Sequence, residues 1–164
     1  MKLLRVLSTV LLFVTALAHP LAADGPADAG WEKLKSLAGE WTGTADKETV
    51  TVSYRIVSSG TAVMETINES HAMEMVTVYH RDGSSLLMTH FCAAGNQPRM
   101  RSTGLVDGKL AFAFVDVSNL KTPADEHISG LVMSFPEGGA LVQEWSSRKD
   151  GKESTMRFLL NRKK

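Results

Sequence analysis

His90 and Cys92 are two residues apart in a largely apolar segment of the 164-residue sequence. In an extended strand, this spacing places both side chains on one face. An imidazole beside a thiol can bind a metal ion or form a reactive couple. The alternative is a core histidine beside a small buried thiol, since an unpaired cysteine often behaves as a hydrophobic residue. The spacing does not supply the further ligands that a metal site needs, so we predict no metal.

Two other titratable residues, His127 and Glu65, occupy strand-like segments with apolar neighbours. If the face that His127 shares with Leu131 is the inner one, His127 is a candidate ligand contact; otherwise it is a solvated histidine at a strand end. An inward Glu65 would be costly unless paired, and Arg99 is a candidate partner, as are Arg101 and Arg157. Such a pair would bind a polar head group. The alternative is that the charged side chains face water.

Methionine recurs in the strand-like segments, at Met64, Met73, Met75, Met88, Met100, Met133 and Met156. Methionine is flexible and polarizable, and it lines surfaces that accept varied apolar shapes. We therefore count Met75, Met88 and Met133 as candidate ligand contacts. Filling gaps in a packed core is the alternative role.

Composition and motifs exclude several function classes. Lysine plus arginine and aspartate plus glutamate number 18 each, so the chain lacks the charge bias of a nucleic-acid-binding protein. Signatures of serine hydrolases, zinc proteases and nucleotide-binding proteins are missing. The active site of a β-barrel enzyme need not contain a local sequence motif, so these absences do not exclude enzymatic activity. We assign no catalytic residue.

The elements that must position these residues are short strands. A helical turn is predicted at 31–37, followed by alternating or apolar segments at 41–45, 50–56, 61–67, 73–80, 86–92, 99–106, 109–117, 127–135, 141–147 and 154–161. Asp82-Gly83 and Asp107-Gly108 mark tight turns. We expect an all-β domain: an antiparallel up-and-down barrel of about eight to ten strands, or alternatively a two-sheet β-sandwich.

Residues 1–23 have the pattern of a signal peptide: Lys2 and Arg5, an apolar run, and cleavage signals ending at Ala18 and Ala23. We expect the mature chain to be exported to the periplasm or the extracellular space, without a stable membrane anchor. Residues 24–30 are predicted to be a flexible tether, and 31–164 the barrel domain.

The first predicted strand carries Gly39-Glu-Trp41-Thr-Gly43 directly after the helical turn. This opening resembles that of calycin-type barrels, a group that includes lipocalins, fatty-acid-binding proteins and nitrobindin-like heme proteins. The resemblance implies that Trp41 closes one end of the barrel against an arginine of the last strand. Arg157 is the first candidate for that arginine and Arg162 the second, because a flat guanidinium stacks well on an indole.

The nitrobindin-like proteins open with Gly-x-Trp-x-Gly-x-Gly, and here Ala45 replaces the last glycine. They bind heme through a histidine late in the chain, whereas no histidine follows His127 here. The resemblance therefore implies either heme on His127 or no cofactor. Residues 88–100 resemble a segment of small exported bacterial proteins of unassigned function, which implies no activity.

Together these observations favour an exported barrel that holds a small apolar or amphipathic molecule. The first alternative is a barrel enzyme whose histidines and glutamate converge in the cavity. The second is heme binding, and the third is a packed domain without a cavity.

Overall fold

The computed structural model describes residues 25–68 and 71–164, so the predicted signal peptide lies outside the described residues. The described chain contains one α-helix, a short 3-10 turn (Ser58–Gly60) and eleven strands. The helix is α1 (Pro26–Ser36), and the strands are β1 (Gly39–Ala45), β2 (Glu48–Val57), β3 (Ala62–Ile67), β4 (Met75–Asp82), β5 (Ser85–Phe91), β6 (Gln97–Ser102), β7 (Leu105–Val106), β8 (Lys109–Ser118), β9 (His127–Ser134), β10 (Leu141–Lys149) and β11 (Lys152–Arg162).

Ten of these strands form a closed antiparallel barrel. The sheet order is β6-β5-β4-β3-β2-β1-β11-β10-β9-β8-β7, and an additional pairing of β6 with β8 closes it. The two-residue β7 pairs with β8 alone and lies beside the barrel. Closure leaves no long unpaired edge on the barrel. The predicted all-β up-and-down barrel is confirmed, and the β-sandwich alternative is wrong.

Alternation of side chains decides which face of each strand is inside. In β6, Pro98, Met100 and Ser102 are buried, whereas the residues between them are more exposed. Asp107 and Gly108 both have positive φ, as a tight two-residue hairpin requires, and they join β7 to β8.

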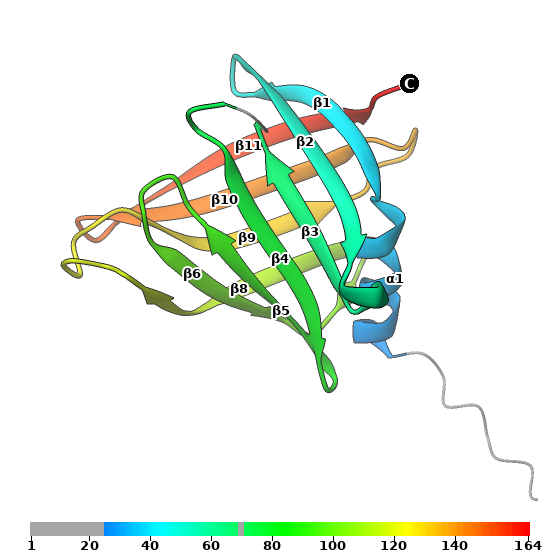
Figure 1. Ribbon diagram of the computed structural model, residues 1–164, viewed down its shortest axis with the longest axis horizontal. Coiled ribbons are helices and arrows are strands. Elements are labelled where there is room, and N and C mark those ends of the chain that lie inside the picture. Colours follow the sequence, from blue (N-terminus) through cyan, green and yellow to red (C-terminus); the bar gives the residue numbers. More distant parts are fainter. Residues whose placement is uncertain (1–24, 69–70) are drawn as a thin grey trace, which may run out of the picture.

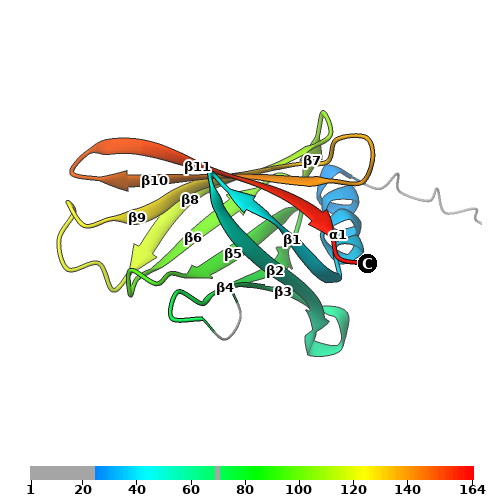
Figure 2. The same cartoon turned by 90° about the horizontal axis from the view of Figure 1, so that it is seen from above.

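Helix α1 covers one end of the barrel (Figures 1 and 2). It begins with Pro26, and Gly25 N–H donates to the Asp28 side chain at 3.1 Å. The expected tether at 24–30 is therefore wrong for residues 26–30. Proline at the first helical position and an acidic residue in the first turn are signals of a helix start. Gly30 is buried so tightly that an added Cβ would lie 2.8 Å from the Leu110 side chain, which fixes the helix against the barrel.

Among residues 25–68 and 71–164, no helix combines the length and apolar character that crossing a bilayer requires.

Trp41 and Arg162 fasten the last strand beneath the helix. Arg162 Cζ lies 4.5 Å from the Trp41 ring centroid, and Trp41 Nε1 donates to the Leu37 carbonyl at 2.8 Å. The same guanidinium donates to the carbonyls of Ala38 and Ser36 at 2.7 and 2.8 Å. The expectation that Arg157 fills this role is wrong. Arg157 lies five positions before Arg162, the residue that pairs with Trp41 in the β1–β11 register, and this is too far along the strand.

Replacement of Arg162 by alanine should lower the free energy of unfolding by about 1 kcal/mol, because stacking and two hydrogen bonds to the end of α1 are lost. Arg157→Ala is the control and should change stability by less than about 0.5 kcal/mol. Urea unfolding of both variants measures the difference; equal effects would contradict the assignment.

Candidate functional site

A cavity of about 590 Å³ lies at the end of the barrel opposite α1. Its lining comes from the ends of strands and the loops that join them at that end. The apolar part of the lining is Ile67, Met73, Met75, Ala93, Ala94, Ile128, Trp145, Met156 and Phe158, and the polar part includes Asp46, His90, Cys92, Glu126, His127, Ser147 and Ser154. The size is within the range of small-molecule sites.

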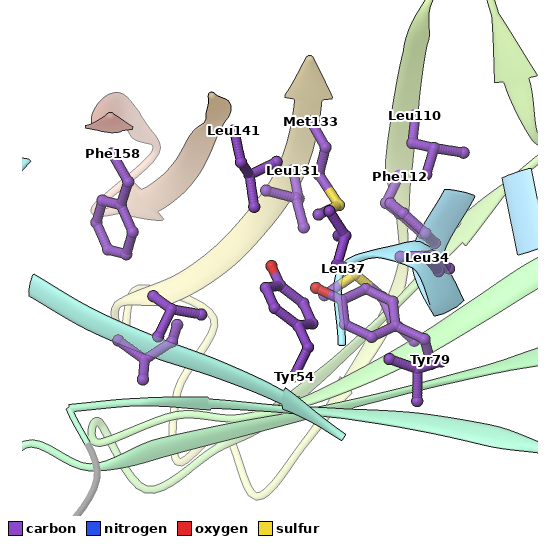
Figure 3. Close-up of a cluster of buried hydrophobic side chains, with 14 of the residues drawn as sticks. Leu34, Leu37, Tyr54, Tyr79, Leu110, Phe112, Leu131, Met133, Leu141 and Phe158 are labelled. Atoms are coloured by element: carbon purple, nitrogen blue, oxygen red, sulfur yellow. The ribbon is translucent and has the colours of Figure 1, made fainter. Parts of the chain in front are cut away.

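The half of the barrel next to α1 is packed solid. Its inward side chains, which are at most 2% exposed, are Leu34, Leu86, Met88, Met100, Leu110, Phe112, Leu131, Met133, Leu141 and Leu160. Figure 3 shows several of them meeting from opposite walls. The barrel is thus divided into a filled half and a hollow half.

The cavity brings together four of the predicted site residues: Met75, His90, Cys92 and His127. Met88 and Met133 instead lie in the packed half, where they fill the core.

Arg99 is on the outer surface and pairs with Asp116, with Nε 2.6 Å from Oδ1. Glu65 points inward but is not part of the cavity lining, and it is fully buried.

Glu65 is the centre of a buried polar cluster between the two halves. Tyr54 Oη donates to its Oε1 at 2.7 Å, and Tyr79 Oη donates to its Oε2 at 2.6 Å. Gln143 Nε2, from the opposite wall, donates to Glu65 Oε1 at 2.5 Å and to Tyr54 Oη at 2.6 Å. Trp145 Nε1 donates to Gln143 Oε1 at 3.1 Å, which fixes the orientation of the amide. Figure 3 shows both tyrosine rings directed into the barrel.

In the part of the chain that the structure describes, the carboxyl group of this cluster has no cationic partner. The expected arginine partners of Glu65 are wrong, because its hydrogen bonds come from Tyr54, Tyr79 and Gln143. Burial raises the pKa of Glu65, and the hydrogen bonds that it accepts oppose that rise. Burial and the adjacent Glu65 also raise the pKa of both tyrosines well above the usual range, so their hydroxyls keep their protons. An amide N–H and two hydroxyls that all donate suit an ionised carboxylate.

A row of directly paired residues connects this cluster to the cavity. In the strand register, Tyr54 of β2 is opposite Glu65 of β3, Glu65 is opposite Thr77 of β4, and Thr77 is opposite His90 of β5. Thr77 is buried, and its Oγ1 lies 2.8 Å from His90 Nδ1. Its hydroxyl also lowers the pKa of Glu65 through a hydrogen bond. The row thus runs from a buried carboxyl group to an imidazole on the cavity wall.

His90 and Trp145 form the floor of the cavity. They come from opposite walls, and their ring centroids are 4.9 Å apart. Burial lowers the pKa of His90 to about 4, so its ring is neutral at neutral pH. His90 is therefore a fixed hydrogen-bonding group and a weak base.

His127 is held at the side of the cavity by its own loop. Its Nδ1 lies 3.0 Å from the Asp125 carbonyl oxygen, and its ring lies 5.4 Å from that of Phe114. A register shift between Ser146 and Ser147 of β10 places Ile128 and His127, neighbours in sequence, both on the lining. Because a carbonyl only accepts, Nδ1 carries the proton.

Cys92 is half-buried at the edge of the lining. Burial raises the pKa of its thiol, and the negative charge of Glu126 adds to the shift. The thiol is therefore protonated at neutral pH, which disfavours the reactive couple with His90. Among the residues that the structure describes, no group of three histidine, cysteine or acidic side chains is arranged to hold a metal ion.

Sequence reasoning missed Tyr54, Tyr79, Thr77 and Gln143. The signal for Tyr54 was present, since it shares the parity of the inward residues Val50 and Val52 in β2. The partnership with Gln143 joins strands 78 positions apart, and alternation does not reveal such a contact.

Comparison with protein-family models and with curated proteins finds no match for this chain. The case for a function therefore depends on the geometry of the barrel and its cavity.

Replacement of Tyr79 by phenylalanine should lower the free energy of unfolding by about 2 kcal/mol, because a buried carboxylate loses a hydrogen-bond donor. The same change in a Glu65→Leu background should cost much less, since the acceptor is already absent. Equal costs in the two backgrounds, measured by urea unfolding, would contradict the cluster.

The depressed pKa of His90 makes the protein less stable in acid. The unfolded chain takes up a proton near the ordinary histidine pKa of 6.5, whereas the folded protein does so only near 4. Stability is therefore lost as the pH falls through this interval, by about 3 kcal/mol in all. Urea unfolding of the wild type and His90→Phe at several pH values isolates this contribution. The wild type should lose stability relative to the variant, and parallel pH curves would exclude the effect.

Proposed function

We propose that the protein is an exported, calycin-type binding protein that holds a small apolar or amphipathic molecule in the open half of its barrel. The single observation that carries the proposal is the cavity of about 590 Å³, set inside a closed barrel whose other half is filled. A fold that needed only a stable core would be expected to fill both halves.

The lining supports an apolar body of varied shape. Met73, Met75 and Met156 all face the cavity, and two of them are about half exposed at the mouth. Flexible, polarizable side chains of this kind adapt to different apolar surfaces. Trp145 and Phe158 add rigid aromatic surface deeper in the cavity.

Enzymatic and heme-binding alternatives have weaker support. His90 and His127 line one cavity, as an acid–base enzyme would need, but the low pKa of His90 makes it a poor base. For heme, His127 would be the ligand, because its Nδ1 is engaged with the Asp125 carbonyl and its Nε2 has no partner among the described residues. The apolar, methionine-rich lining does not itself favour heme, because it suits equally a ligand that is held by apolar contacts without coordination.

The mature chain should bind the neutral fluorescent probe N-phenylnaphthylamine and enhance its emission, because the probe leaves water for the cavity. Replacement of Met75 by tryptophan should abolish the enhancement by filling the cavity. Met64→Trp, on the outer face of β3, is the matched control and should bind as the wild type does.

Native mass spectrometry of the protein purified from an exporting host provides an independent measurement. A retained molecule with the mass of an amphiphile would support the proposal, whereas retained heme would favour the heme alternative. Absence of both a retained mass and probe binding would overturn the proposal.

A further inference from the structure

The charged residues that line the cavity are acidic. Asp46 and Glu126 line it, and among the described residues no lysine or arginine does. Lys149 lies 3.6 Å from Glu126 but outside the lining, and it offsets part of that charge at the surface. Below the floor, the buried Glu65 adds a further negative charge without a cationic partner. An anion in the cavity would therefore meet repulsion and no counter-ion.

Both histidines of the lining present an acceptor. His127 is 6% exposed, and its Nδ1 donates to the Asp125 carbonyl, so in the neutral ring Nε2 bears a lone pair. No described residue is a partner of that Nε2.

The proton position on His90 follows from Thr77. The Thr77 hydroxyl has one proton, and the strand register places Thr77 directly opposite Glu65, so we assign that proton to the carboxyl side of the row, where the hydroxyl also lowers the pKa of Glu65. Toward His90, Thr77 Oγ1 therefore accepts, and His90 Nδ1 carries the proton. His90 is only 1% exposed, and its Nε2 is left as an unpartnered acceptor on the cavity floor.

We propose that the ligand is an amphiphile whose polar end is a hydrogen-bond donor, a hydroxyl or amino group, seated against His90 and His127, and that the site rejects carboxylate and phosphate amphiphiles. This inference rests on the proposed function, because it names the chemistry of the molecule held in the same cavity. These two acceptors on the lining have no hydrogen-bond partner among the described residues, and each gains one from such a donor. The acidic lining disfavours the anion and tolerates the ammonium group.

The test uses three amphiphiles with the same chain, decanol, decylamine and decanoate, which compete with N-phenylnaphthylamine at neutral pH. Decanol and decylamine should displace the probe at concentrations at least about tenfold lower than decanoate does, since decanoate forms no hydrogen bond to the two acceptors and is repelled by the acidic lining. Displacement by decanoate at an equal or lower concentration would overturn the inference. Failure of the probe itself to bind would instead refute the proposed function.

Two variants identify the groups responsible. His90→Phe should weaken decanol about fivefold more than it weakens the probe, since decanol alone loses the hydrogen-bond acceptor. His80→Phe, on the outer face of β4, is the matched control and should leave all three competitors unchanged. An unchanged decanol affinity in His90→Phe would overturn the role of His90.

Ser154→Lys tests the charge of the lining without touching the buried cluster. Ser154 is exposed on β11 and lines the cavity, so the variant should fold. The added cation should strengthen decanoate and weaken decylamine, each about fivefold. If neither affinity changes, the acidic lining does not select the ligand and that part of the inference is wrong.

Discussion

A carboxyl group buried at the centre of a barrel constrains everything around it. Glu65 is removed from water, and within residues 25–68 and 71–164 no lysine or arginine pairs with it. The buried carboxyl group is therefore stabilised by neutral hydrogen-bond donors, which come from three different strands: Tyr54 from β2, Tyr79 from β4 and Gln143 from β10. A half-satisfied cluster of this kind is more costly than an apolar core, so these strands are held in one register.

The same cluster explains why the two halves of the barrel differ. On the α1 side, leucines and methionines pack together beneath the helix and are almost fully buried. On the other side, the row through Thr77 ends in His90, whose ring meets Trp145 and forms a floor. Polar atoms on that floor need partners, and apolar packing would not provide them. The hollow half is thus where the polar layer meets a ligand or water.

The sequence predicted the strands well because their alternation and their Asp-Gly turns are local signals. The start of α1 was missed because proline and glycine are typical of loops. Here Pro26 is the first residue of the helix, and Gly30 allows the helix to lie close against the barrel. The face of Glu65 was left open, because a charged residue in a strand faces water by default. Only the tertiary partners, which lie far apart in sequence, overrule that default.

The choice between Arg157 and Arg162 also required the third dimension. Both lie in β11, and only the register with β1 decides which one reaches Trp41. The predicted ligand-contacting methionines are divided between the packed core and the cavity. Alternation shows which residues face inward, but it does not show how far along the barrel axis each residue lies.

The pairing of β1 with β11 joins Trp41 to Arg162, so the seam of the barrel is made by the two ends of the domain. Contacts between residues so distant in sequence form late in folding, because closing the long intervening loop costs chain entropy before the contacts stabilise the fold. Until the last strand has joined the first, the cavity has no complete wall, since Ser154, Met156 and Phe158 all belong to that strand. The binding site is therefore a property of the finished chain, and occupancy of the cavity reports that folding is complete.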